Sequence, residues 1–175
     1  MRLFELQFPL DQVARYAARF PAQDEDRQRA IGVAARARGW YSRAEFLQVC
    51  RWKTARSAPL VAQNSAGQVK AATRIALASG TGDQAALRAL LGLTGVGWAT
   101  ASVLLHVTHP ERYPIWDVRA LQALGINHRL APSDARWSEY VTTYRDLIQR
   151  AGVDGRTLDK GLWQWSVEHG GPLPA

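Results

Sequence analysis

The chain has 175 residues, of which 47% are hydrophobic and seven are tryptophan, and its formal net charge is +7 at neutral pH. This length suffices for one well-buried domain or for two small lobes that share a core, and the apolar content argues against disorder. No apolar run approaches the ~20 residues that a membrane span requires, and the N-terminal segment lacks the apolar core of a signal peptide, so we expect a cytoplasmic protein. The single cysteine, Cys50, excludes an internal disulfide and any site built from four thiolates.

Helical periodicity continues through almost the whole chain, and no convincing pair of alternating strands is present. We therefore expect an all-α protein of about nine helices, most of them short. Two capping boxes, Ser42 with Glu45 and Ser65 with Gln68, mark the starts of two helices. No repeat, low-complexity tract or long linker indicates independent domains. In chain order, the helices are expected at about 11–20, 24–38, 42–50, 65–76, 83–91, 100–107, 116–124, 133–152 and 154–169.

The positive charge favours a polyanionic partner, since the pI is near 10.2. Many stable proteins are basic for no specific reason, so charge alone raises the prior for nucleic acid only about twofold. One basic group lies within a single predicted helix and also fits a solvated helix face; its members are Arg27, Arg29, Arg36 and Arg38. The other fills a predicted connection before Pro59, beside Trp52, and is harder to explain as solvation alone; its members are Arg51, Lys53 and Arg56.

A glycine-rich turn is predicted between two helices, within the stretch LTGVGWATA that spans 93–101. Gly95 and Gly97 permit backbone dihedrals that a Cβ would penalise by roughly 1 kcal/mol each. They also leave the N–H groups of 95–97 bare at the start of the next helix, where the helix dipole suits a phosphate. An ordinary turn between helices with a glycine cap explains the same residues. The matched apolar faces before and after the turn favour a packed helix pair with an exposed tip.

A carboxylate follows at the start of another predicted helix, in the stretch YPIWD that spans 113–117. Pro114 sets an extended segment ahead of Asp117, which opens the helix. An acid at a helix N-terminus is common because the helix dipole favours it there. Taken with the glycine turn, Asp117 is more readily interpreted as an acid held beside a gripped DNA strand.

These two segments together resemble the helix-hairpin-helix superfamily of base-excision DNA glycosylases (HhH-GPD). The pattern is Leu-x-Gly-Val-Gly-x-x-Thr-Ala followed by Pro-Ile-x-Asp, and the likeness is closest over about 89–125. The resemblance implies a single all-α module of two lobes with a DNA cleft between them. The middle-helix lobe would span about 21–113, and the second lobe would combine about 1–20 with 114–175.

The resemblance also implies roles for residues of the hairpin and for the aspartate. The hairpin would bind DNA phosphates, with a monovalent cation (K⁺ or Na⁺) held by the backbone carbonyls of Leu91, Leu93 and Val96. Asp117 matches the family aspartate. Its carboxylate would stabilise the positive charge that develops on the sugar as the N-glycosidic bond breaks, and it would orient the attacking water.

The chain departs from the family pattern at several positions. Ala99 stands where bifunctional members carry a lysine nucleophile, so no Schiff base can form there and no lyase activity is expected. Thr94 replaces a proline, and the cysteines of the iron–sulfur branch are missing. Arg119 stands where some members have His or Asn; an arginine there can still reach a phosphate.

The basic connection over 50–57 lies where the family places a loop that fills the hole left by an extruded base. Lys53 and Arg56 would add charge there, and Trp52 would offer a stacking face. A basic surface turn with a buried Trp52 accounts for the same residues equally well. The aromatic residues expected to line a base pocket lie at helix ends near charges; they are Trp40, Tyr41, Trp52 and Trp116.

The sequence thus predicts a monofunctional DNA N-glycosylase that flips a modified base, hydrolyses its N-glycosidic bond and leaves an abasic site. Asp117 is the predicted catalytic residue, no cofactor beyond the hairpin cation is expected, and the protein would act on double-stranded DNA as a cytoplasmic, nucleoid-associated monomer. The predicted DNA-binding residues are Gly95, Val96, Gly97, Thr100, Lys53, Arg56 and Arg119.

Two other classes of protein stay open. A non-catalytic helix-hairpin-helix DNA-binding protein would keep its DNA affinity without releasing a base. A helical protein–protein adaptor with incidental charge would show no salt-dependent DNA binding, whereas several phosphate contacts give a steep loss of affinity with salt. The sequence does not identify the base.

Overall fold

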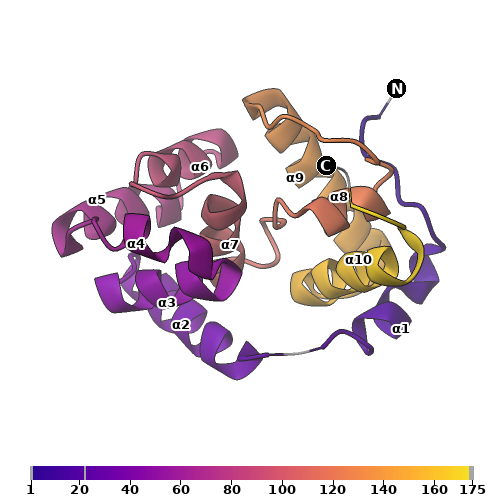
Figure 1. Ribbon diagram of the computed structural model, residues 1–175, viewed down its shortest axis with the longest axis horizontal. Coiled ribbons are helices and arrows are strands. Elements are labelled where there is room, and N and C mark those ends of the chain that lie inside the picture. The colour runs from indigo at the N-terminus through magenta and orange to yellow at the C-terminus, as the bar shows by residue number, and fades with distance from the viewer. Residues whose placement is uncertain (1, 22, 174–175) are drawn as a thin grey trace. The chain divides into compact units, whose positions relative to one another are not determined.

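A computed structural model of the chain describes residues 2–21 and 23–173. Across these residues the protein has ten α-helices and no β-strand, which confirms the predicted all-α class (Figure 1). The helices are α1 (Val13–Ala17), α2 (Glu25–Arg38), α3 (Arg43–Lys53), α4 (Ala58–Val61), α5 (Ala66–Leu77), α6 (Asp83–Leu91), α7 (Trp98–Thr108), α8 (Val118–Ala123), α9 (Asp134–Ala151) and α10 (Gly155–His169). Two short 3₁₀ turns, η1 (Leu10–Gln12) and η2 (Ala55–Ser57), precede α1 and α4.

Both predicted capping boxes are present and set the starts of α3 and α5. The Glu45 N–H donates to Ser42 Oγ at 3.3 Å, and the Ser42 N–H donates to Glu45 Oε2 at 2.8 Å. Ser65 and Gln68 make the same reciprocal pair at 2.8 and 3.2 Å. Each box satisfies two backbone groups that a helix start would otherwise leave unpaired.

The structure corrects the boundaries of several predicted helices. The first helix is shorter than 11–20, because η1 precedes α1 and the chain leaves the helix after Ala17. The helix expected from 116 begins at Val118, since Asp117 has extended dihedrals (φ −127°, ψ 136°) as its N-cap. In the other direction, α3 continues to Lys53, so 50–53 are helical rather than part of a connection. No helix breaker occurs before Thr54, and Arg, Trp and Lys all tolerate a helix.

The chain divides into two compact units. The middle unit is Gln23–His109, and the terminal unit combines the chain up to residue 21 with the chain from Pro110 onward. Within the described residues, no helix has both the length and the apolarity needed to cross a membrane.

In the middle unit, α7 contacts α2, α3, α5 and α6. Most of its residues are buried, because its small and apolar side chains leave no polar face to turn toward water. At Gly32, α2 approaches α7 so closely that a Cβ would lie 1.9 Å from the Val107 carbonyl oxygen.

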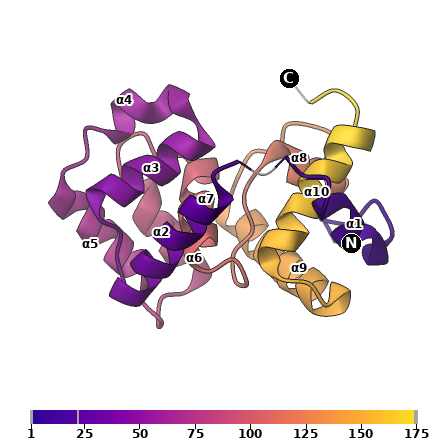
Figure 2. The same ribbon diagram turned by 90° about the horizontal axis from the view of Figure 1, so that it is seen from below.

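In the terminal unit, α10 packs along α1 and α8, as both views show (Figures 1 and 2). The extended N-terminal segment is bonded to the end of α8: the Glu5 and Gln7 N–H groups donate to the carbonyls of Leu124 and Ala123, both at 3.0 Å. A buried aromatic core underlies α9; it comprises Tyr113, Trp137, Tyr140 and Tyr144.

Candidate nucleic-acid interface and carboxylate site

The α6–α7 turn, residues 92–97, carries the glycine pattern in the middle unit. Two of its side chains anchor it, because Leu93 and Val96 are each only 6% exposed. The Val96 N–H donates to the Leu93 carbonyl at 3.2 Å and closes the turn, so the prediction that the N–H groups of 95–97 are all bare is wrong for Val96. Thr94 and Gly97 are exposed. The turn therefore buries its apolar side chains and presents mainly backbone to solvent.

The two glycines of the turn have different physical reasons to be glycine. Gly95 has φ +77°, and a Cβ there would lie 2.6 Å from Leu60 Cβ and 2.8 Å from the Val61 nitrogen. The fold itself therefore requires Gly95. Gly97 has φ −94° and ψ −177°, which any residue adopts, and no atom beyond its two chain neighbours lies within 4 Å of the position of its Cβ. The expected dihedral reason for Gly97 is wrong, and nothing in the fold demands glycine at this position.

Gly97 is the N-cap residue of α7 and offers no capping side chain. The first N–H groups of an α-helix have no acceptor within the helix, so an N-cap side chain commonly accepts from one of them. With glycine at the cap and open space around it, an external acceptor can reach these donors. The positive end of the α7 dipole adds to the attraction for an anion. Thr100, in the first turn of α7, is only 4% exposed.

The α6–α7 turn is held from outside by Asn64, a residue that the sequence analysis did not single out. Its side chain bonds both the N–H and the carbonyl of Thr94, at 2.9 and 2.8 Å. An asparagine just before an N-cap serine is an ordinary loop residue by its pattern, so the sequence carried no signal for this contact.

The three carbonyls expected to hold a monovalent cation, those of Leu91, Leu93 and Val96, belong to the same turn or adjoin it. Backbone carbonyls are hard oxygen ligands of the kind that K⁺ and Na⁺ accept. The Leu93 carbonyl also accepts the Val96 N–H, which uses one of its two lone pairs. Among the described residues, no group of three or more His, Cys, Asp or Glu side chains could hold a metal ion.

Positive charge is concentrated in the middle unit. Residues 23–109 contain half of the 22 Lys and Arg residues but only a third of the 15 Asp and Glu residues, so this unit carries nearly all of the net charge of +7. Lys53 ends α3 and is half-buried, while Arg56 lies in η2 and is exposed. Trp52 is half-buried and its indole N–H donates to the Gln23 carbonyl at 3.2 Å.

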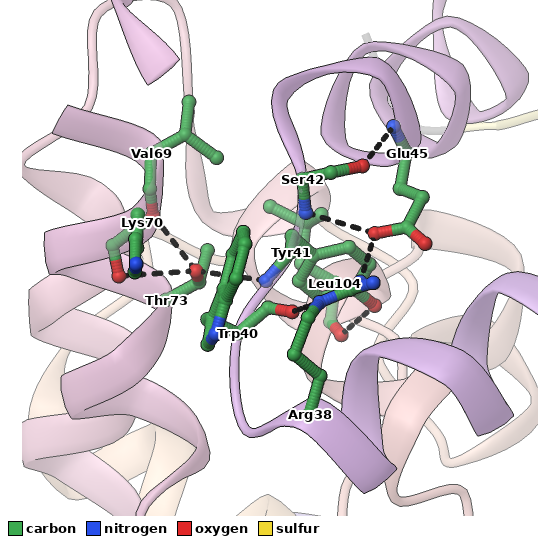
Figure 3. Close-up of polar contacts among 9 residues, drawn as sticks. All are labelled: Arg38, Trp40, Tyr41, Ser42, Glu45, Val69, Lys70, Thr73 and Leu104. Carbon is green, nitrogen blue, oxygen red and sulfur yellow. Dashed lines mark hydrogen bonds and ion pairs between the residues drawn. The ribbon is translucent and has the colours of Figure 1, made fainter. Parts of the chain in front are cut away.

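Two of the aromatic residues predicted for a base pocket make contacts within the middle unit. The Tyr41 hydroxyl donates to the Leu104 carbonyl at 2.7 Å, and the Tyr41 N–H donates to Thr73 Oγ1 at 3.0 Å (Figure 3). Tyr41 is 1% exposed, and burial raises the pKa of its hydroxyl well above the ordinary value. It thus offers no open ring face. Trp40 makes cation–π contacts with two residues of its own unit. Arg38 Cζ lies 4.7 Å and Lys70 Nζ lies 4.5 Å from the centre of the Trp40 ring.

Asp117 lies in the terminal unit as the N-cap of α8. Its Oδ1 accepts the Arg119 N–H at 2.9 Å, and the residue is partly exposed. The segment before it is fixed by burial: Tyr140 donates its hydroxyl to the Ile115 carbonyl at 3.0 Å, and Trp116 packs edge-to-face on the Tyr140 ring. A buried segment on one side and a cap on the other hold the carboxylate in a defined place.

Two other predicted site residues, Trp116 and Arg119, lie close to Asp117 in the sequence and belong to the same unit. Trp116 is 8% exposed and borders a cavity of about 220 Å³ together with Val118 and Leu121. The Arg119 guanidinium lies over α10, 3.5 Å from the Ser166 carbonyl and 5.9 Å from the centre of the Trp163 ring. The predicted residues therefore fall into two sets, one in each unit: the α6–α7 turn with Lys53 and Arg56, and Asp117 with its neighbours.

Comparison of the chain with models of known protein families gives no match, and neither do comparisons with curated proteins or with solved structures.

Proposed function

We propose that this protein is a monofunctional DNA N-glycosylase with a two-lobed helix-hairpin-helix fold. In this proposal the α6–α7 turn binds a backbone phosphate of double-stranded DNA and Asp117 carries the chemistry. The observation that carries the proposal is Gly97: the fold does not need a glycine there, yet its missing side chain leaves the start of α7 accessible to an anion.

The charge of the middle unit supports the DNA part of the proposal. A unit with twice as many basic as acidic residues attracts a polyanion, and each neutralised phosphate releases counterions that drive binding. Lys53 and Arg56 would add contacts to the backbone, and a monovalent cation at the turn would add to the local positive charge. Backbone contacts position the duplex without reading its sequence.

The glycosylase part rests on Asp117. As the bond between C1′ and the base nitrogen breaks, the bonding electrons leave with the base and positive charge develops on the sugar. The carboxylate stabilises this charge and orients a water, whose oxygen bonds to C1′ and whose released proton neutralises the departing base. Ala99 supplies no amine, so water is the nucleophile and the product is an abasic site.

A second candidate function is a non-catalytic DNA-binding protein. It is supported by the contact that Asp117 makes with the Arg119 N–H, because capping α8 is a sufficient structural reason for an acid at this position.

Measuring base release by the parent and by Asp117→Asn distinguishes a glycosylase from a non-catalytic DNA-binding protein. Asparagine caps a helix as well as aspartate, so the variant should fold like the parent while it loses the charge. The matched control is Asp154→Asn, which makes the same change at the N-cap of α10, where Asp154 accepts the Thr157 N–H at 2.8 Å. We expect Asp117→Asn to abolish base release and to bind duplex DNA at least as tightly as the parent, and Asp154→Asn to leave both unchanged.

The substrates for this assay are duplexes that each carry one oxidised, alkylated or deaminated base. Strand breaks should appear only after alkali, and borohydride should trap no covalent adduct. Full turnover by Asp117→Asn would refute its assignment, and a trapped adduct would refute the water mechanism. Binding without release across the whole panel would favour the non-catalytic candidate.

A further inference from the structure

Asn64 fills a buried position between α4 and α5, and its side chain is fully used in hydrogen bonds. It is 2% exposed. Its Nδ2 donates to the carbonyls of Val61 and Thr94 at 2.9 and 2.8 Å, and its Oδ1 accepts the Thr94 N–H at 2.9 Å. Only a primary amide supplies two donors and an acceptor in this arrangement. Neither a carboxylate nor a hydroxyl reproduces it.

The backbone around Asn64 is itself anchored to α3. Arg43 Nε donates to the Asn64 carbonyl at 2.8 Å, and Arg43 Nη2 donates to the Ala62 carbonyl at 2.7 Å. Charge-assisted bonds of this kind are stronger than neutral ones. Asn64 therefore connects two parts of the unit. Its backbone carbonyl is bonded to Arg43 of α3, and its side chain is bonded to Thr94 of the α6–α7 turn.

The contact with Thr94 fixes the part of the turn that lies between its two buried side chains, Leu93 and Val96. Pairing both the N–H and the carbonyl of one residue restrains the peptide groups on either side of it. The next residue, Gly95, is pressed against Leu60 and Val61, and Gly97 has no side chain that could pack. Without the Asn64 bonds, the glycines would give the turn more backbone freedom than other residues allow.

We propose that Asn64 is a positioning residue for the DNA-binding turn, which it holds in the conformation that presents Gly97 and the start of α7 to a phosphate. This inference rests on the proposed function. It also limits which donors serve the phosphate: the Thr94 N–H is used by Asn64 and the Val96 N–H by the Leu93 carbonyl, so neither is offered to the anion. Preorganisation of this kind raises affinity because the ordering cost is met before binding.

Asn64→Asp tests the inference because the new side chain has almost the same shape but lacks the two N–H donors of the amide. The carboxylate can still accept the Thr94 N–H, but it faces two carbonyl oxygens to which it can no longer donate. The matched control is Asn127→Asp, the same change at an exposed residue of the terminal unit. Both variants and the parent are measured against one undamaged duplex over a series of salt concentrations, at a temperature where circular dichroism shows each to be folded.

We expect Asn64→Asp to weaken binding roughly tenfold or more and to lower the slope of log K against log salt by about one phosphate contact. Asn127→Asp should change affinity by about threefold at most. A variant that merely lowers stability changes neither quantity in the folded protein. If Asn64→Asp fails to fold, Asn64→Ser takes its place, and parental affinity with a parental salt slope in either variant overturns the inference.

The same titrations distinguish failure of the inference from failure of the proposed function. If Gly97→Asp loses affinity while the Asn64 variant does not, the turn binds DNA but Asn64 does not position it. If Gly97→Asp also binds like the parent, the turn is not the DNA contact. If the parent itself shows no salt-dependent binding, the proposed function is wrong.

Discussion

Gly97→Asp should make the protein more stable and at the same time a weaker DNA binder. Gly97 has the extended dihedrals of an N-cap residue and open space where its Cβ would lie, so an aspartate fits without displacing an atom. Its carboxylate would accept an N–H from the first turn of α7, the position that the proposal assigns to a phosphate oxygen. The new carboxylate and a DNA phosphate would thus compete for the same N–H groups at the start of α7, so this one substitution tests the proposed phosphate site.

The stability gain comes from the cap and from the helix dipole. Replacing glycine by aspartate at an N-cap is worth a few tenths of a kcal/mol, and a negative charge at a helix start adds about 0.3–1 kcal/mol. A total of about 0.5–1 kcal/mol corresponds to a rise in Tm of about 1–4 °C for a chain of this size.

The loss of affinity comes from two sources. The carboxylate occupies the donors that would bind the phosphate, and it repels any phosphate that approaches. Two like charges about 4 Å apart repel by roughly 1 kcal/mol in bulk water and 4 kcal/mol near a protein surface. The dissociation constant should therefore rise by at least about fivefold, and the salt slope should fall by about one phosphate.

Gly82→Asp is the control for this experiment. Gly82 is the N-cap of α6, also without a capping side chain, and nothing lies within 4 Å of its Cβ position. It lies at the opposite end of α6 from the turn, so it receives the same gain in stability and the same charge. Thermal melts and fluorescence anisotropy with a labelled duplex measure both effects. Equal affinity for the two variants would refute the assignment of the α6–α7 turn, whatever the melts show.

Two further predictions concern the stability of each unit. Gly32→Ala should destabilise the middle unit by about 1–3 kcal/mol or more, because its Cβ would meet the Val107 carbonyl oxygen at 1.9 Å. Gly67 lies in the first turn of α5 with only Ser65 Oγ nearby, at 3.9 Å, so Gly67→Ala should stabilise the same unit by about 0.5–1 kcal/mol. Urea melts measure both changes in the free energy of unfolding, and opposite signs for the two variants would confirm the close crossing of α2 and α7. In the terminal unit, the hydrogen bond from Arg19 lowers the pKa of Glu168 from 4.5 to about 2, so this carboxylate contributes stability above pH 4.5 that is lost as the pH falls toward 2. Glu168→Gln should thus lower the free energy of unfolding at pH 7, and the difference from the parent should shrink across that range; a constant difference would contradict this account.

Local patterns predicted the helices because local interactions determine where they begin. The boxes at Ser42 and Ser65 are closed within four residues, so their signal is complete in the sequence. The end of α3 was missed for a related reason. The basic residues up to Lys53 suggested a connection because of their charge. Arg and Lys are nevertheless good helix formers, so α3 continues through them to Lys53.

Long-range contacts account for what the sequence could not show. Tyr41 lies beside charged residues in the sequence, but its partners are Thr73 and Leu104, 32 and 63 residues away. Asn64 acquires its role from Thr94, 30 residues away. Contacts at this separation depend on how helices pack, which a reading of neighbouring residues does not include.

The capping role of Asp117 is compatible with the chemical role that we propose for it. A carboxylate has two oxygens, and Oδ1 is committed to the Arg119 N–H at the start of α8. That bond and the buried segment from Tyr113 to Trp116 restrict rotation of the Asp117 side chain. The carboxylate would therefore lose little further freedom when a substrate binds. A carboxylate that must face a developing positive charge gains from being fixed in advance. Capping is thus a means by which this chain can preorganise a reacting acid, and only the charge distinguishes the two roles. This is why an asparagine, which keeps the cap and removes the charge, is the decisive substitution at this position.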